Sequence, residues 1–211
     1  MKITKIGHCC LVIKDKGKVI LTDPGIFSTE QDELAGIDIV LITHEHTDHL
    51  HTESLKKVLK NNPTAKVITN TSVGKILSAE NILFKVLEGN KSEMFDDLLI
   101  EAFDGIHEDI YDSVPVVQNT GYIISNKLFY PGDSFKLPGK KVDILALPVV
   151  APWLKLSQSI DYALKISPRV VFPVHDGFLK SPGPFYRIPK AVLEKSNIEF
   201  NELPLNLEVE L

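Results

Sequence analysis

Short apolar runs separated by polar turns occupy most of the chain, and they predict a protein rich in β-strands. At the amino end, strands are expected at residues 3–7, 9–13 and 18–21, with a hairpin turn at Lys16 and Gly17. Further strands are predicted at 38–42, 66–69, 83–87, 98–103, 120–125, 127–130, 142–147 and 169–174, and one or two more between 199 and 211.

Helical periodicity appears between several of these strands. Residues 52–61 place Leu55, Val58 and Leu59 on one face, which predicts an amphipathic helix with Thr52 as its N-cap. Other helices are expected at 71–78, at 157–165 with Ser157 as N-cap, and at 188–196, while 27–36 and 181–187 are expected to be loops near the functional site. Strands that alternate with helices indicate an α/β (α+β) protein with helices laid on sheets.

Length and composition fit one folded unit. At 211 residues, with 44% hydrophobic and 24% charged residues, the chain is expected to form a single domain over 1–211. The formal charge of −5 argues against a nucleic-acid partner. No stretch approaches the roughly 20 apolar residues of a membrane span, and no signal peptide is recognised, so a cytoplasmic location is the expectation.

Four potential metal ligands stand within six residues directly after the apolar run at 37–42. They are His44, His46, Asp48 and His49. Neither a strand nor a helix alone would direct all four to one point, because the side chains of either element repeat with a fixed period. A loop between a buried strand and a helix can do so, and the sequence therefore predicts a metal site in this loop.

The spacing His44-x-His46-x-Asp48-His49 resembles the HxHxDH signature of the metallo-β-lactamase-fold hydrolases. The resemblance extends along the chain in the order of that family. It implies a four-layer αβ/βα sandwich in which two mixed β-sheets are flanked by helices, with metal ions held by loops at one edge.

Three distant residues match the remaining metal ligands of the family. His107 is the only histidine between 51 and 175, and Asp133 and His175 each follow a predicted strand. By this resemblance, one ion takes His44, His46 and His107, the second takes Asp48, His49 and His175, and Asp133 bridges them together with a hydroxide. Asp23 is implied to orient the histidine-rich loop without itself binding metal, although an ordinary turn residue is the alternative.

The donor set consists of imidazoles and carboxylates without thiolate. Such donors suit zinc, which is favoured, and also manganese or iron. Two divalent ions would generate hydroxide from bound water and polarise a substrate oxygen. Asp48 could additionally steer or accept a proton.

Departures from the family pattern narrow the choice among the branches of the family. Metallo-β-lactamases proper place a cysteine where this chain has Asp133, and the diiron oxygen-reducing branch carries an acidic residue at the position of His46. The inserted domain of the RNA-processing nucleases has no room in 211 residues. The chain most resembles the small branch with ascorbate-lactone hydrolase-like and phospholipase-like members.

The leading hypothesis is a dinuclear metal-dependent hydrolase whose metal-bridging hydroxide attacks a small ester, lactone or phosphodiester. An iron-dependent oxidoreductase of the sulfur dioxygenase type is the second hypothesis, and a non-catalytic binding module is the third. The partner is a small-molecule substrate, and the sequence leaves the substrate, the metal and the oligomeric state open.

For several other residues the sequence supports two interpretations. His8 is either a hydrogen-bonded core histidine or a residue at the edge of the site. Cys9 and Cys10 are expected to be packing residues, because the Cα atoms of neighbouring residues are about 3.8 Å apart, too close for an ordinary disulfide. Side chains that line a pocket or simply pack in the core are Tyr111, Trp153, Phe185 and Tyr186, and Arg187 and Lys190 either hold an anionic group or face solvent.

Overall fold

The computed structural model describes residues 1–211 and contains two seven-stranded sheets. The first sheet has the order β14-β1-β2-β3-β4-β5-β6. Its strands are β1 (Lys2–Gly7), β2 (Cys10–Asp15), β3 (Lys18–Thr22), β4 (Ile39–Leu41), β5 (Lys66–Thr69), β6 (Lys85–Val86) and β14 (Glu208–Glu210). Strands β3 to β6 run parallel, whereas β1, β2 and β3 form an antiparallel meander.

The second sheet has the order β13-β12-β11-β10-β9-β8-β7. Its strands are β7 (Ser92–Phe95), β8 (Leu98–Ile106), β9 (Gln118–Ile124), β10 (Leu128–Tyr130), β11 (Ile144–Pro148), β12 (Val170–Val174) and β13 (Glu199–Phe200). Strands β10 to β13 are parallel, and β7 to β10 are antiparallel.

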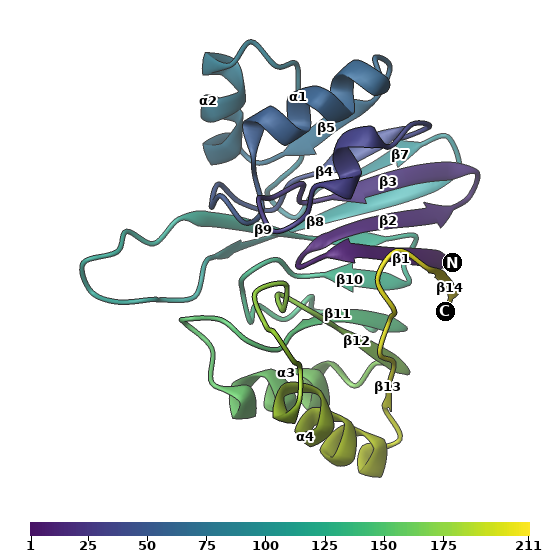
Figure 1. Cartoon of the computed structure of the whole chain (residues 1–211), viewed down its shortest axis with the longest axis vertical. Helices are drawn as coiled ribbons and strands as arrows, with labels where there is room; N and C mark the ends of the chain where they lie inside the picture. Colours follow the sequence, from purple (N-terminus) through teal and green to yellow (C-terminus); the bar gives the residue numbers. More distant parts are fainter.

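Two helices cover the outer face of each sheet (Figure 1). Helices α1 (Thr52–Asn61) and α2 (Thr71–Ala79) lie on the first sheet, and α3 (Leu156–Ile166) and α4 (Pro184–Leu193) lie on the second. Short 3-10 turns occur at Glu30–Glu33 and Glu194–Ser196. The order helix, sheet, sheet, helix confirms the expected αβ/βα sandwich.

Alternation along the strands explains the layers. In β4, Ile39 and Leu41 belong to the core between the sheets, whereas Val40 packs with Leu55 and Val58 of α1. Strand β11 behaves in the same way in the second sheet, where Ile144 and Ala146 face inward and Leu145 and Leu147 face the outer helices. Successive side chains of a strand point to opposite faces, so each buried strand supplies two cores.

The boundaries differ from the expectations at several places. The expected N-caps are wrong: Thr52 and Leu156 are the first residues of their helices, and the caps are His51 and Lys155. The loop expected at 181–187 is wrong in part, because α4 already begins at Pro184. Proline at the first helical position has a φ angle suited to a helix start, and α4 then continues through Pro189.

Two edge strands also differ from the expectations. Strand β7 was not expected, because its mixed polar residues lie at the sheet edge and are mostly exposed or half-buried. The predicted strand at 83–87 is only Lys85–Val86. No helix in the structure combines the length and the apolar character that crossing a membrane requires.

Candidate metal centre

The predicted ligands gather at one edge of the sandwich, where parallel strands of both sheets end. The loop from His44 to His49 follows β4, His107 follows β8, and Asp133 and His175 follow β10 and β12. Strands β4 and β3 share a direction in one sheet, as do β8, β10 and β12 in the other. Their carboxyl ends therefore bring distant residues to the same place, which lies at the left in Figure 1.

The side chains form two groups whose ligand atoms lie within 4.8 Å of one another. One group contains His44, His46 and His107, and the other contains His8, Asp48, His49 and His175.

Asp133 lies between the two groups. Its Oδ1 is 3.1 Å from His49 Nε2, and its Oδ2 is 2.9 Å from His175 Nε2 and 3.3 Å from His107 Nε2. The structure therefore brings together all seven residues that the sequence singled out as ligands.

The donor atoms fit bound cations better than they fit each other. The Nε2 atoms of His44, His49 and His175 and the Oδ1 of Asp133 are buried and make no hydrogen bond of acceptable geometry, although His49 and His175 lie within 3.1 Å of Asp133 oxygens. Buried polar atoms normally have partners. Two donors on one tetrahedral zinc ion would lie about 3.4 Å apart, and the separations of 2.9–3.8 Å around Asp48 and Asp133 are close to that value.

Asp23 lies beneath the histidine-rich loop and is fully buried. Its Oδ2 accepts hydrogen bonds from His49 Nδ1, Thr43 Oγ1 and Tyr130 Oη, each at 2.7 Å, and its Oδ1 accepts from the Thr43 backbone N–H at 2.8 Å. These contacts are the ones that a residue orienting the loop would make. The turn at Pro24 and Gly25 also contacts the loop, because a Cβ on Gly25 would lie 1.8 Å from Asp48 O.

The Nδ1 atoms of His107 and His175 face acceptors as well. His107 Nδ1 lies 2.5 Å from the Glu108 carbonyl, and His175 Nδ1 lies 2.7 Å from the Val150 carbonyl. Because a carbonyl oxygen can only accept, Nδ1 carries the proton in both rings. The Nε2 atoms that face the centre are thereby left to bind metal, as is general for metal-ligating histidines.

Carboxylates dominate the electrostatics around His49 and His175 in the second group. Burial lowers the pKa of His49 and His175, but nearby carboxylates, Asp133 foremost, outweigh burial and hold both pKa values well above the ordinary range. Burial raises the pKa of Asp133, yet His175 and His49 hold it well below its usual range. This ionised carboxylate favours cations, and a metal that replaces protons on the two histidines would release them.

The first group is different, because burial dominates there. It lowers the pKa of His44 well below the ordinary value and also lowers that of the half-buried His46. Neutral imidazoles are the form that binds metal.

Four site positions have left-handed backbone conformations. His8, Asp23, His175 and Gly132 have φ angles of 50°, 36°, 63° and 65°. Non-glycine residues adopt such angles rarely, and they concentrate at functional sites. At Gly132 a Cβ would also lie 2.3 Å from Asn119 Oδ1, so glycine is required beside Asp133.

Sequence reasoning missed the role of Trp153 and left that of His8 open. Trp153 is buried, and its Nε1 donates to Asp133 Oδ2 at 3.0 Å. No spacing rule identifies it, because it lies in a loop far from the motif. His8 follows β1 at the same edge as the ligands, and that position at a strand end was the available signal.

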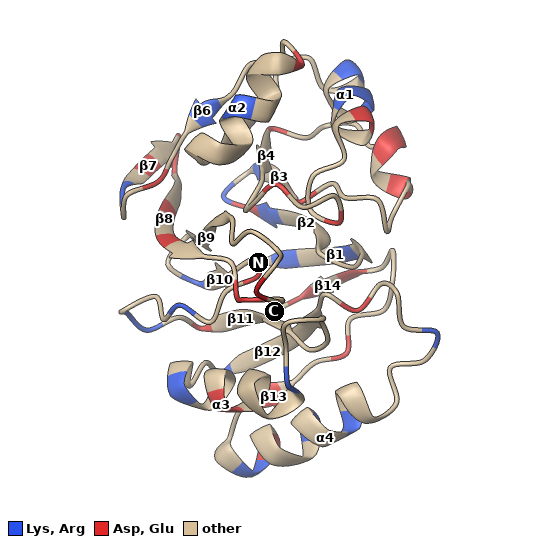
Figure 2. Cartoon of the chain, turned by 90° about the vertical axis from the view of Figure 1, so that its left-hand side faces the viewer, with Lys and Arg blue, Asp and Glu red and all other residues tan.

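Some of the remaining candidate residues are buried in the cores, and others are exposed at the surface. Cys9 and Cys10 are free and buried in the cores, although Cys9 also lies within 4.8 Å of ligand atoms of His49 and Asp133. Tyr111 is exposed, and Lys190 pairs with Glu202 on the surface. Lysine and arginine are scattered over several helices and strands in Figure 2.

Comparisons with known proteins agree with this geometry. Residues 2–175 match the family model described as the beta-lactamase superfamily domain. The chain is 29% identical to Protein Rv0786c of Mycobacterium tuberculosis, with 97% of each covered, and 30% identical to a UPF0173 protein of Pyrococcus furiosus, with 87% of each covered.

One more relative by sequence and one solved structure are also similar to this chain. A UPF0173 metal-dependent hydrolase of Caldivirga maquilingensis is 26% identical over 81% of this chain and 79% of its own length. A solved protein from Parabacteroides distasonis superposes with a TM-score of 0.80 at 27% identity, covering 97% of this chain and 93% of that one. The fold, the gathered histidines and aspartates and these matches show that the chain belongs to the metallo-β-lactamase superfamily, as a metal-dependent hydrolase with a beta-lactamase superfamily domain.

Proposed function

We propose that this protein hydrolyses a small ester, lactone or phosphodiester with two divalent metal ions. The observation that carries the proposal is the position of Asp133, which lies within 3.3 Å of histidines from both groups. One carboxylate between two sets of imidazoles is suited to a pair of cations rather than to one. We also propose that residues 1–211 act as one hydrolase domain, because both sheets supply ligands.

The residues divide between the two ions as the groups suggest. His44, His46 and His107 would hold one ion, and Asp48, His49 and His175 would hold the other, with Asp133 shared. Zinc suits imidazole and carboxylate donors, and manganese or iron are alternatives. When bound, such a pair of ions lowers the pKa of a coordinated water and polarises the oxygen of the substrate.

The chain's own residues would then position and protect the reacting groups. The side chain of Asp48 is 22% exposed, whereas those of His49, Asp133 and His175 are 0–2% exposed. Asp48 is therefore the carboxylate in the second group that a substrate can reach, and it could steer or accept a proton. Trp153 holds Asp133 by its N–H, and its ring lies 5.8 Å from His107 and 5.9 Å from His175.

Two aromatic residues beside the second group favour a substrate with an apolar part. Phe27 and Phe178 are 43% and 44% exposed, and their ring centroids are 5.8 Å apart. Both rings pack against His8, at 4.9 and 5.5 Å. Phe178→Ala should raise KM for esters with a large apolar acyl group more than for acetyl esters.

Elemental analysis combined with hydrolysis tests the proposal. We expect about two zinc or manganese ions per chain, a reduced amount in His46→Ala and His107→Ala, and turnover of esters, lactones or phosphodiesters that falls with the metal. His51→Ala is the matched control, because His51 lies in neither group and its side chain makes no cap hydrogen bond.

Two outcomes would contradict the proposal. Iron together with oxygen consumption would instead support the oxidoreductase hypothesis. Full hydrolysis by metal-free His46→Ala would remove the metal-dependent mechanism.

A further inference from the structure

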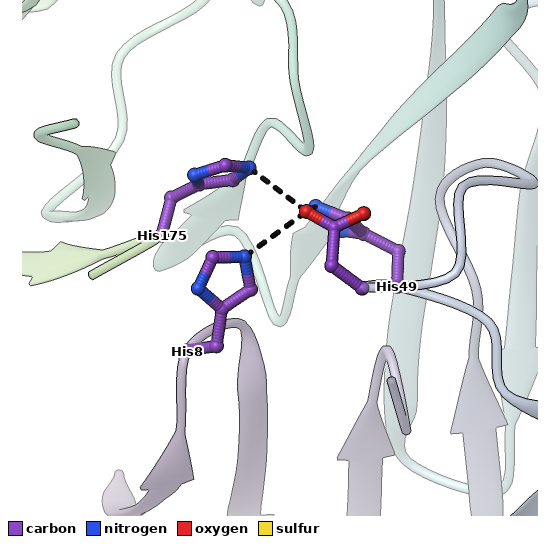
Figure 3. A group of neighbouring side chains, drawn as sticks. His8, His49 and His175 are labelled. Carbon is purple, nitrogen blue, oxygen red and sulfur yellow. Dashed lines mark hydrogen bonds and ion pairs between the residues drawn. The ribbon is translucent and has the colours of Figure 1, made fainter. Parts of the chain in front are cut away.

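His8 lies in the turn between β1 and β2 and points at the second group of ligands. Its side chain is 2% exposed, and its Nε2 lies 3.2 Å from Asp48 Oδ2. Figure 3 shows His8 and His175 directed at the same carboxylate oxygen, with His49 beside it. By position alone, His8 is suited to be an additional metal ligand.

The other ring nitrogen decides between a ligand and a donor. The backbone N–H of Gly177 donates to His8 Nδ1 at 3.1 Å. A backbone N–H can only donate, so Nδ1 must present its lone pair, and the proton of the neutral ring is on Nε2. An Nε2 that carries a proton has no lone pair for a metal, whereas it can donate to Asp48.

His8 thus has the opposite tautomer to its neighbours. The Nδ1 atoms of His49 and His175 face the Asp23 carboxylate and the Val150 carbonyl, which leaves their Nε2 atoms unprotonated when they bind metal. His8 Nδ1 faces a donor instead. The hydrogen bond at Nδ1 therefore suits His49 and His175 to bind metal through Nε2. The contact at Nδ1 of His8 instead suits this residue to donate a hydrogen bond from Nε2.

We propose that His8 is a positioning residue that donates its Nε2–H to Asp48 Oδ2 and does not bind metal. The inference rests on the proposed two-metal centre and adds to it the means by which Asp48 is held. The side chain of Asp48 is 22% exposed, so contact with solvent would not hold it in one position, whereas the hydrogen bond from His8 would. The protein donors of the second ion are then Asp48, His49, His175 and Asp133.

The surroundings of His8 fix its ring in this orientation. The His8 carbonyl accepts from the His175 backbone N–H at 3.2 Å, and a Cβ on Gly177 would lie 2.8 Å from His8 Cβ. The turn that carries Gly177 is itself anchored, because Lys5 Nζ lies 2.6 Å from Asp176 Oδ2 in a buried ion pair. These contacts hold the backbone of His8 in place, and the partners at its two ring nitrogens, the Gly177 N–H and Asp48 Oδ2, favour this orientation of the ring.

Nitrogen NMR of the histidine side chains tests the assignment directly. In protein labelled with ¹⁵N, both the metal-free and the ¹¹³Cd-loaded forms should show His8 with Nε2 protonated and Nδ1 unprotonated. His49 and His175 should show ¹¹³Cd coupling at Nε2, and His8 should show none. The His8→Gln variant identifies the His8 signal by its disappearance.

Each contrary result has a distinct meaning. Cadmium coupling at His8 Nε2, or a proton on His8 Nδ1 in the metal-free protein, would overturn the positioning role while leaving the two-metal function intact. Absence of coupling at every histidine would overturn the metal centre and the proposed function with it. Metal binding without turnover of any substrate would overturn the function but not the role of His8.

Variants of His8 separate positioning from ligation by a second measurement. His8→Phe should keep the same number of bound metal ions and lower kcat/KM or metal affinity by about 10- to 100-fold, as expected for an outer partner of a ligand. His8→Gln should recover part of the loss, because its amide can accept from Gly177 and donate to Asp48. Loss of one ion per chain in His8→Phe and His8→Gln alike would contradict the proposal.

Discussion

Asp23 Oδ2 lies 2.7 Å from His49 Nδ1, and neither side chain is exposed to solvent. The contact fixes which nitrogen of His49 faces the metal centre. Because the same carboxylate also accepts from Thr43 and Tyr130, it connects β3, the ligand loop and β10. One buried acid thus links both sheets under the site.

Asp23→Asn should lower metal affinity by about 10- to 100-fold, because the amide removes the charge that holds His49 and turns a donor toward groups that need an acceptor. Chelator competition measures the affinity. Asp96→Asn is the control, since Asp96 is mostly exposed and pairs only with Lys18. Equal affinities in the two variants would show that Asp23 does not orient the loop.

Gly132→Ala should destabilise the protein more than Gly139→Ala. Both glycines have positive φ, at 65° and 68°, so both substitutions carry the left-handed strain of about 1–2 kcal/mol. Only Gly132 is crowded, because its Cβ would lie 2.8 Å from Thr43 Cβ, whereas Gly139 has no atom within 4 Å. This crowding should lower the free energy of unfolding of Gly132→Ala by a further amount of about 1–3 kcal/mol.

Urea unfolding of the two glycine variants measures the difference. Gly132→Ala should also bind less metal, because the strain is next to Asp133. Equal unfolding free energies would mean that the close approach to Thr43 and Asn119 relaxes without cost.

Trp153 should report metal binding by its fluorescence. It is the only tryptophan of the chain, and its Nε1 donates to Asp133 Oδ2 while its ring packs near His107 and His175. Addition of zinc to protein stripped by a chelator should change the emission with the stoichiometry found by elemental analysis. Emission that stays constant while zinc binds elsewhere would contradict the site. The variant Trp153→Phe should keep the fold and lose the signal.

The two cysteines should not react in the folded protein. Burial raises the pKa of the Cys10 thiol, so less thiolate is present at any pH than in a free cysteine, and Cys9 is 2% exposed. An aromatic disulfide reagent at pH 8 should therefore modify neither thiol until urea unfolds the chain, when both should react. Rapid modification of one thiol without unfolding would show that the core opens beside the centre.

Much of the framework around the site could be predicted from local sequence patterns. Residues 44–49 needed a loop between a buried strand and a helix, and the structure has β4 before it and α1 from Thr52. Local patterns sufficed here because the ligands are close in sequence and the flanking elements have clear periodicity. His107, Asp133 and His175 could be assigned only through their order in a known family, because single residues after strands carry no periodic signal.

How distant side chains share protons and charge depends on the folded arrangement of the two sheets. The pairing of Trp153 with Asp133, and of His8 with Asp48 on one side and Gly177 on the other, joins segments that no local rule connects. Helix starts also depended on such contacts, since His51 caps α1 while its N–H binds the Pro24 carbonyl. Sequence patterns fix periodicity along the chain, whereas the partner of each ring nitrogen depends on where two sheets bring their strand ends together.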